Sequence, residues 1–115
     1  MRDYRINADV VSVTKDHGVL ALGFSDTVAG QGQPIYLLLQ RAGKDKAIYV
    51  EVNDQINSGY DLITAIADGP GELTIKVKPE FRQLGSPETI RVTYAVTDRN
   101  AEAVREGLKQ IMDET

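Results

Sequence analysis

Short runs of alternating apolar and polar residues restrict the fold of this chain more than any other feature of its sequence. A period of two is typical of β-strands that place one face against a core. Apolar side chains occupy every second position in six runs: residues 6–10, 19–24, 35–39, 48–53, 73–77 and 90–96. Residues 62–67 form a weaker seventh run. The alternation therefore predicts six or seven strands.

Two of these runs depart from simple alternation. The first run has its apolar residues at even positions, whereas Val11 and Val13 are apolar at odd positions, so the end of this run is not clear from the pattern. Residues 35–39 are apolar on both parities, which indicates a strand buried on both faces.

Turn-forming residues separate the runs. Glycine supplies positive φ angles, proline fixes φ, and asparagine or aspartate bonds its own backbone. Such residues stand at 16–18, 43–45, 57–59, 68–71 and 85–87. Connections this short favour antiparallel neighbours, because a parallel crossover needs about a dozen residues or more.

The C-terminal segment changes to a helical period. The apolar residues that share one side of this helix are Ala101, Val104, Leu108, Ile111 and Met112. Thr97 or Asp98 is the expected N-cap, because a side-chain oxygen there accepts a bond from an unpaired backbone N–H. Gly107 lies on the flank of the helix and costs about 1 kcal/mol relative to alanine. A close contact between helix and sheet would explain it.

These patterns predict an α+β fold: an antiparallel, twisted β-sheet of six to seven strands with one C-terminal amphipathic helix packed on its apolar face. The chain has 115 residues, enough for one hydrophobic core and too few for two. No repeat, low-complexity tract or linker divides it, so residues 1–115 are expected to form a single domain.

Composition excludes several classes of protein. A net charge of −4 argues against nucleic acid as the main partner. Because cysteine is absent, the chain has no disulfide, thiolate zinc site or cysteine nucleophile. Residues 1–7 lead into no apolar stretch, and no window reaches the roughly 18 apolar residues of a membrane span. A cytoplasmic protein without membrane contact is the resulting prediction.

Residue types that carry chemistry occur without the partners they would need. His17 is the single histidine and stands in an Asp-His-Gly turn, so a solvated turn residue is expected. Ser25 lacks the second glycine of a nucleophile elbow. The segment that begins at Asp54 starts like a calcium loop, but Ile56 and Ala65 stand where ligands are required. We therefore predict that the protein is not an enzyme and holds no metal or cofactor.

Charge is distributed unevenly along the chain. The segment from Ala47 to Ile75 contains no lysine or arginine but five carboxylates: Glu51, Asp54, Asp61, Asp68 and Glu72. These 29 residues carry a net charge of −5, and the other 86 sum to +1. An uncompensated acidic surface attracts a basic partner. On this interpretation the carboxylates are exposed and unpaired.

A second interpretation of the segment stays open, in which its acids are merely solvated around a turn and Tyr60 packs over the sheet edge. The tyrosines support the first interpretation, because tyrosine offers a large contact area with few rotamers. The candidate partner-binding residues are Tyr49, Glu51, Asp54, Gln55, Tyr60 and Asp61.

Three motifs stand close together in this region: Tyr-Leu-Leu-Leu-Gln-Arg at 36–41, Tyr-Val-Glu-Val-Asn-Asp-Gln at 49–55 and Ser-Gly-Tyr at 58–60. With the strands and helix that follow, they resemble the immunity protein 10 family of bacterial polymorphic toxin systems. The resemblance spans residues 35–112, about two thirds of the chain. It implies a small cytoplasmic α+β protein that binds and neutralises a cognate toxin, and it implies no catalytic residue. Its motif residues here are Tyr49, Glu51, Asp54, Gln55, Gly59 and Tyr60.

The chain departs from the family pattern in two places. Family members often carry a longer acidic insert where this chain has only Ala42 to Ile48, and they tend to continue Ser-Gly-Tyr with Gly-Gly-Ile, where this chain has Asp61-Leu62-Ile63. Either difference would alter which toxin is recognised. Gly59 is expected to serve turn geometry.

The leading hypothesis is an immunity protein that neutralises a toxin domain without catalysis, through an acidic surface that contains tyrosine. The alternative is a structural or interaction module that self-associates through the unpaired backbone groups of edge strands. A small-molecule-binding or enzymatic domain is a third hypothesis, and it would need a deep apolar pocket. The sequence leaves the oligomeric state open.

Overall fold

The computed structural model describes residues 3–28, 35–43, 46–81, 87–97 and 99–112. Within these residues the chain forms nine strands and one helix. In chain order the elements are β1 (Asp3–Ala8), β2 (Val10–Asp16), β3 (Val19–Asp26), β4 (Ile35–Arg41), β5 (Tyr49–Val52), β6 (Asp54–Tyr60), β7 (Ile63–Gly69), β8 (Glu72–Val77), β9 (Thr89–Tyr94) and α1 (Ala101–Met112).

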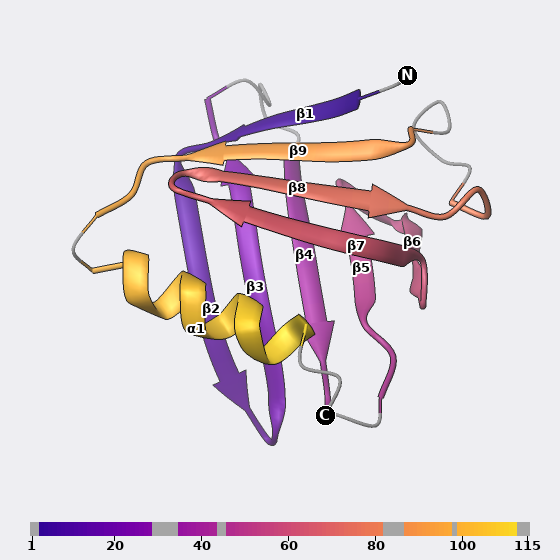
Figure 1. Ribbon diagram of the computed structural model, residues 1–115, viewed down its shortest axis with the longest axis horizontal. Coiled ribbons are helices and arrows are strands. Elements are labelled where there is room, and N and C mark those ends of the chain that lie inside the picture. The colour runs from indigo at the N-terminus through magenta and orange to yellow at the C-terminus, as the bar shows by residue number, and fades with distance from the viewer. Residues whose placement is uncertain (1–2, 29–34, 44–45, 82–86, 98, 113–115) are drawn as a thin grey trace.

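Two sheets pack face to face. The five-stranded sheet has the strand order β2-β3-β4-β5-β6, and each neighbouring pair in it is antiparallel. The four-stranded sheet has the order β1-β9-β8-β7, in which β1 runs parallel to β9 and the other pairs are antiparallel. In Figure 1 the strands of the four-stranded sheet lie across those of the five-stranded sheet, as in orthogonal β-sandwiches.

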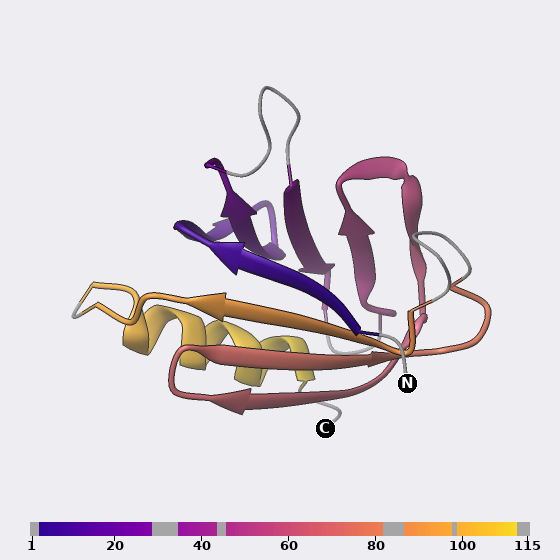
Figure 2. The same cartoon turned by 90° about the horizontal axis from the view of Figure 1, so that it is seen from above.

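Helix α1 extends the layer that contains the four-stranded sheet. Figure 2 shows the helix at the depth of this sheet, Figure 1 shows it next to β7, and it contacts β7 together with β2, β3 and β4 of the opposite sheet. Val104, Leu108 and Ile111 follow the helical period and are buried on the side that meets the five-stranded sheet. The predicted amphipathic helix is therefore confirmed, but Ala101 and Met112, which were expected on its apolar side, are exposed.

The core lies between the sheets and beneath α1. Its strands contribute alternate residues, because successive side chains of a strand point to opposite faces. Burying a large aliphatic side chain stabilises the fold by about 1.5–3 kcal/mol. The fully buried core residues include Leu22, Phe24, Leu37, Leu39, Val50, Val52, Leu73, Ile75, Ile90, Val92 and Leu108.

The predicted α+β class is confirmed, but the prediction of one antiparallel sheet with six or seven strands is wrong. There are two sheets, and β1 pairs in parallel with β9, which the long stretch of chain between these two strands allows. The described residues form two more strands than the seven predicted runs: one is β6, and the other arises at Asp9, where the chain passes from one sheet to the other. The Asp9 N–H donates to the Ser25 carbonyl at 2.9 Å, and the parity of buried residues changes there.

The turn predicted at 57–59 is also wrong, because these residues continue the edge strand β6. The chain reverses at Asn53, which has a φ of 64°. The Asn57 side chain donates to the Val52 carbonyl at 3.0 Å and so holds the register shift that follows the reversal. A Cβ on Gly59 would lie 2.6 Å from Leu62 Cδ1, so a larger residue there would displace the Leu62 side chain.

The structure tests two expectations about α1, the residue that caps its N-terminus and the close contact at Gly107. The Asn100 N–H donates to Thr97 Oγ1 at 3.1 Å, and the Ala101 N–H donates to the Thr97 carbonyl at 3.0 Å. Thr97 therefore caps the helix, while Asp98 lies outside the described residues. A Cβ on Gly107 would lie 3.2 Å from both Leu22 methyl carbons, which is the close helix–sheet contact that the glycine predicted.

Candidate protein-binding surface

Three of the six candidate residues, Tyr49, Glu51 and Tyr60, lie on the outward side of the five-stranded sheet. Val50 and Val52 of β5 are buried in the core, so Tyr49 and Glu51 point to the opposite face. Strand β4 places Leu38 opposite Glu51. The outward large or charged residues of β4, β5 and β6, here named the outer tyrosine face, are Tyr36, Leu38, Tyr49, Glu51 and Tyr60.

Glu51 is the buried anion at the centre of this face. Only 8% of its surface is exposed. The Tyr49 hydroxyl donates to Oε1 at 2.5 Å, and the Tyr36 hydroxyl donates to Oε2. Each carboxylate oxygen thus accepts one bond from a neutral phenol. Among the described residues no lysine or arginine forms an ion pair with Glu51.

The pKa values of both phenols are raised. For Tyr36 the main cause is burial, followed by the hydrogen bond to Glu51. For Tyr49 the hydrogen bond to Glu51 comes first, because ionising the phenol beside a carboxylate would replace a bond by repulsion. Both tyrosines therefore stay protonated donors across the physiological range.

Tyr60 and Ile56 make the edge strand β6 the most exposed apolar part of this region. Their exposed fractions are 68% and 76%. The ring of Tyr60 packs against that of Tyr49, with centroids 5.2 Å apart and planes tilted by 53°. Such tilted aromatic pairs are favourable and restrain both rings. Tyr60 is thus held in place while most of its surface remains accessible.

Asn53 positions Tyr36 from the corner between β5 and β6. Its N–H donates to the Tyr36 carbonyl at 3.1 Å, and its side-chain oxygen accepts from the Tyr36 N–H at 2.8 Å. The side-chain oxygen of Asn53 therefore takes the place of a backbone carbonyl as the acceptor for the Tyr36 N–H where β5 ends. Its nitrogen also donates to the Tyr4 hydroxyl at 2.5 Å, which ties the corner to β1.

The remaining predicted residues lie along β6 or just beyond it. Asp54 and Gln55 are exposed, and Asp54 accepts from the Ile56 N–H at 3.3 Å. Asp61, which has a φ of 59°, forms an ion pair with Lys78 at 3.2 Å. The candidate set therefore contains a central cluster around Glu51 and a separate rim of exposed polar residues.

The prediction that the acidic segment presents unpaired carboxylates on one surface is wrong. Glu51 is buried and Asp61 is paired, while Asp68 and Glu72 belong to β7 and β8 of the other sheet. Glu72 faces Arg91 of β9 at 3.5 Å. The sequence segment crosses from one sheet to the other, so its charge is divided between them.

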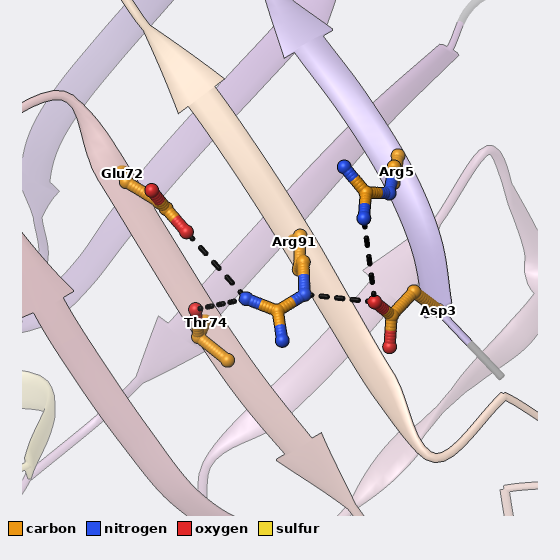
Figure 3. Close-up of polar contacts among 5 residues, drawn as sticks. All are labelled: Asp3, Arg5, Glu72, Thr74 and Arg91. Atoms are coloured by element: carbon orange, nitrogen blue, oxygen red, sulfur yellow. Dashed lines mark hydrogen bonds and ion pairs between the residues drawn. The ribbon is translucent and has the colours of Figure 1, made fainter. Parts of the chain in front are cut away.

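Figure 3 shows how the outward side of the four-stranded sheet is neutralised. The Arg91 guanidinium lies between Asp3 of β1, at 2.8 Å, and Glu72 of β8. It also donates to Thr74 at 3.5 Å, and Arg5 lies 3.6 Å from Asp3. These carboxylates therefore have cationic partners, in contrast to Glu51.

The outward strand positions of the five-stranded sheet contain no lysine or arginine within the described ranges. On β2 and β3 they are mainly small or hydroxyl-bearing, such as Ser12, Ala21 and Gly23. A Cβ on Gly23 would lie 2.9 Å from Ser12 Oγ, so the sheet surface is closely packed there. At the end of β4, Arg41 and Lys46 line a hollow of about 350 Å³ beside Tyr49 and Tyr60, and the Arg41 guanidinium donates to the carbonyls of Gly43, Lys46 and Ile111.

Neither a metal cluster nor a membrane-spanning helix occurs among the residues that the structure describes. No three histidine or acidic side chains gather there as metal ligands, and α1 is too short and too polar to cross a bilayer. His17 lies in the β2–β3 turn with a φ of 52°, and its Nδ1 is 2.8 Å from Asp16.

Tyr36 and Asn53 were missed as parts of the site. Tyr36 belongs to a run that is apolar on both parities, and this pattern predicts a strand buried on both faces, whereas the Tyr36 side chain is only half-buried. Tyr36 alternates with the core residues of its strand, as Tyr49 and Glu51 alternate with those of theirs. This alternation is the signal that its side chain points away from the core. The strand expected at 48–53 includes Asn53, and nothing in the neighbouring sequence predicts a positive φ there.

A scan of protein-family models and a search of curated proteins both find no significant match to this chain. The resemblance to the immunity protein 10 family therefore stays a prediction that depends on the motif residues.

Proposed function

We propose that this chain is an immunity-type protein that binds and neutralises a toxin domain without catalysis, through the outer tyrosine face. The observation that supports it is a set of large aromatic side chains around an anion that has no cationic partner among the described residues. The toxin as partner rests on the motif resemblance. A cytoplasmic location belongs to the same proposal.

The outer tyrosine face has the composition expected of a protein interface. Tyrosine is enriched in interfaces and in the few residues that dominate their binding energy. Tyr60 is accessible yet held by Tyr49, so little rotamer entropy is lost when a partner covers it. The negative charge of Glu51 and Asp54 favours a basic partner and accelerates its association.

The test uses the toxin domain encoded by the neighbouring gene, where toxin and immunity genes are expected to lie together. Co-expression should protect cells from that toxin, and the purified proteins should form a complex. Tyr60→Ala should raise the Kd at least tenfold, as for a dominant interface residue. Asp54→Lys should slow association and weaken its dependence on salt.

A matched control distinguishes this face from general charge effects. Glu72→Lys makes the same charge reversal on the four-stranded sheet and should leave Kd within about twofold, as for a residue outside the interface. Lack of protection or of complex formation would refute the proposed function. Equal losses for Asp54→Lys and Glu72→Lys would refute the location.

Self-association is a second candidate, favoured by the exposed edge strand β6 with Ile56 and Tyr60 on it. Unpaired N–H and C=O groups of an edge strand can pair with a second copy. Light scattering over a range of concentrations separates the two: a monomer at all concentrations removes this candidate.

A further inference from the structure

The Glu51 carboxylate retains bonding capacity after its two tyrosines are counted. An ionised carboxylate has about four lone-pair sites on its two oxygens. Tyr36 occupies one site on Oε2 and Tyr49 one on Oε1. One site per oxygen is left, and a bidentate donor needs one site on each oxygen.

The charge of Glu51 is also left uncompensated. A phenol satisfies a hydrogen bond but does not cancel a full negative charge. No described lysine or arginine pairs with Glu51, and no outward strand position of the five-stranded sheet holds one. Placing an anion in a largely buried position without a counter-charge is costly. A cation supplied from outside would recover part of that cost.

The rings around Glu51 select among cations. The rings of Tyr36 and Tyr49 flank the carboxylate, and aromatic faces attract cations. A guanidinium is planar, stacks on aromatic rings and donates two parallel bonds to one carboxylate. A lysine ammonium is more strongly hydrated and cannot make that bidentate contact.

We propose that Glu51 is the receptor for an arginine side chain of the partner protein, which lies against Tyr36 and Tyr49 and donates to both carboxylate oxygens. This inference rests on the proposed function for the identity of the partner, but the cation site itself can be tested alone. The site takes a guanidinium in preference to an ammonium.

The probe is N-acetyl-arginine amide, added to ¹⁵N-labelled protein while amide NMR shifts are followed. We expect saturable shifts around Glu51 and Ser58 in the millimolar range. The citrulline analogue has the same shape without the charge and should bind at least tenfold more weakly. The lysine analogue should also bind more weakly.

Two variants localise the effect. Glu51→Gln keeps the size of the side chain, and its amide can accept from one tyrosine and donate to the other, so the fold is expected to persist. It should weaken arginine binding at least tenfold, whereas Glu72→Gln on the other sheet should leave it within twofold. The citrulline comparison requires no variant and so remains valid even if Glu51→Gln unfolds.

The outcomes separate this inference from the proposed function. Equal binding of the arginine and citrulline analogues, unchanged affinity in folded Glu51→Gln, or no saturation would overturn the arginine site. A toxin that depends on Tyr60 but binds Glu51→Gln with unchanged affinity would overturn it as well, while the proposed function stands. Arginine binding without any toxin complex would support the site and refute the proposed function.

Discussion

The carboxylates on the outward faces of the two sheets have opposite kinds of partner, cationic on one sheet and neutral on the other. On the four-stranded sheet Asp3 and Glu72 share the Arg91 guanidinium, which comes from the strand between them. On the five-stranded sheet Glu51 is enclosed by Tyr36 and Tyr49 and meets no cation among the described residues. One face is neutralised internally, and the other is left with a negative charge.

This difference shows that charge counted along the chain does not locate a charged surface. Arg91 lies 88 residues from Asp3 in sequence but directly beside it in the sheet. Within the acidic segment, Asp61 pairs with Lys78 and Glu72 pairs with Arg91, two cations that lie outside the segment. Glu51, which is the most deeply buried of its acids, keeps its charge because phenols satisfy its oxygens without an opposite charge.

The largest expected effect comes from removing both phenols. In Tyr36→Phe/Tyr49→Phe the buried carboxylate loses two bonds, each worth about 1.5–3 kcal/mol for a charged acceptor. We expect the free energy of unfolding to fall by about 3 kcal/mol, measured by urea denaturation with circular dichroism. Adding Glu51→Gln to that variant should recover part of the loss, because a neutral amide is less costly to bury. A loss below about 1 kcal/mol would show that Glu51 is solvated instead.

A smaller effect is expected at alkaline pH. Tyrosines with raised pKa values bind a proton in the folded protein at pH values where the unfolded chain has released it. Their contribution is therefore complete below pH 10, the ordinary tyrosine pKa, and is lost as pH rises above it. Each such tyrosine changes the stability by at most about 1.4 kcal/mol per pH unit.

Urea denaturation between pH 9 and 11 checks this sign. The stability of the wild-type protein should fall above pH 10, and Tyr36→Phe should fall less steeply over the same interval. Identical slopes for the two proteins would contradict the assignment of Tyr36 as a donor to Glu51.

The smallest effect is expected on the four-stranded sheet. Arg91→Gln removes a partly exposed network and should cost about 0.5 kcal/mol at low salt. In about 1 M NaCl, where the screening length is ~3 Å, that cost should largely vanish. The loss in Tyr36→Phe/Tyr49→Phe should persist in the same salt. Equal salt sensitivity would remove the distinction between the two faces.

Local patterns predicted much of the fold. Alternation identified core residues such as Leu22, Leu39 and Val50, since burial of one strand face depends on the parity of nearby residues alone. The helix and its Thr97 cap follow from equally local signals. The change of parity at Val11 and Val13 marks the passage into a second sheet, but a change of parity alone does not distinguish a second sheet from an irregular strand.

The pairings between distant strands could not be predicted in this way. Nothing in residues 3–8 indicates that they pair with 89–94, because backbone hydrogen bonds do not specify a partner. The site was found only in part for the same reason. Tyr49 and Glu51 are neighbours in sequence, whereas Tyr36 reaches Glu51 only through the register of β4 and β5.

The parallel pairing of β1 with β9 has a consequence for synthesis on the ribosome. Strands β2 to β6 follow one another as consecutive antiparallel neighbours, so that sheet can assemble while the rest of the chain is still being translated. The first strand has no mate in its own sheet until residues 89–94 emerge. We therefore expect the nascent protein to have a complete outer tyrosine face while the inward face of the same sheet is still uncovered. Strand β1 is then the segment most in need of a chaperone.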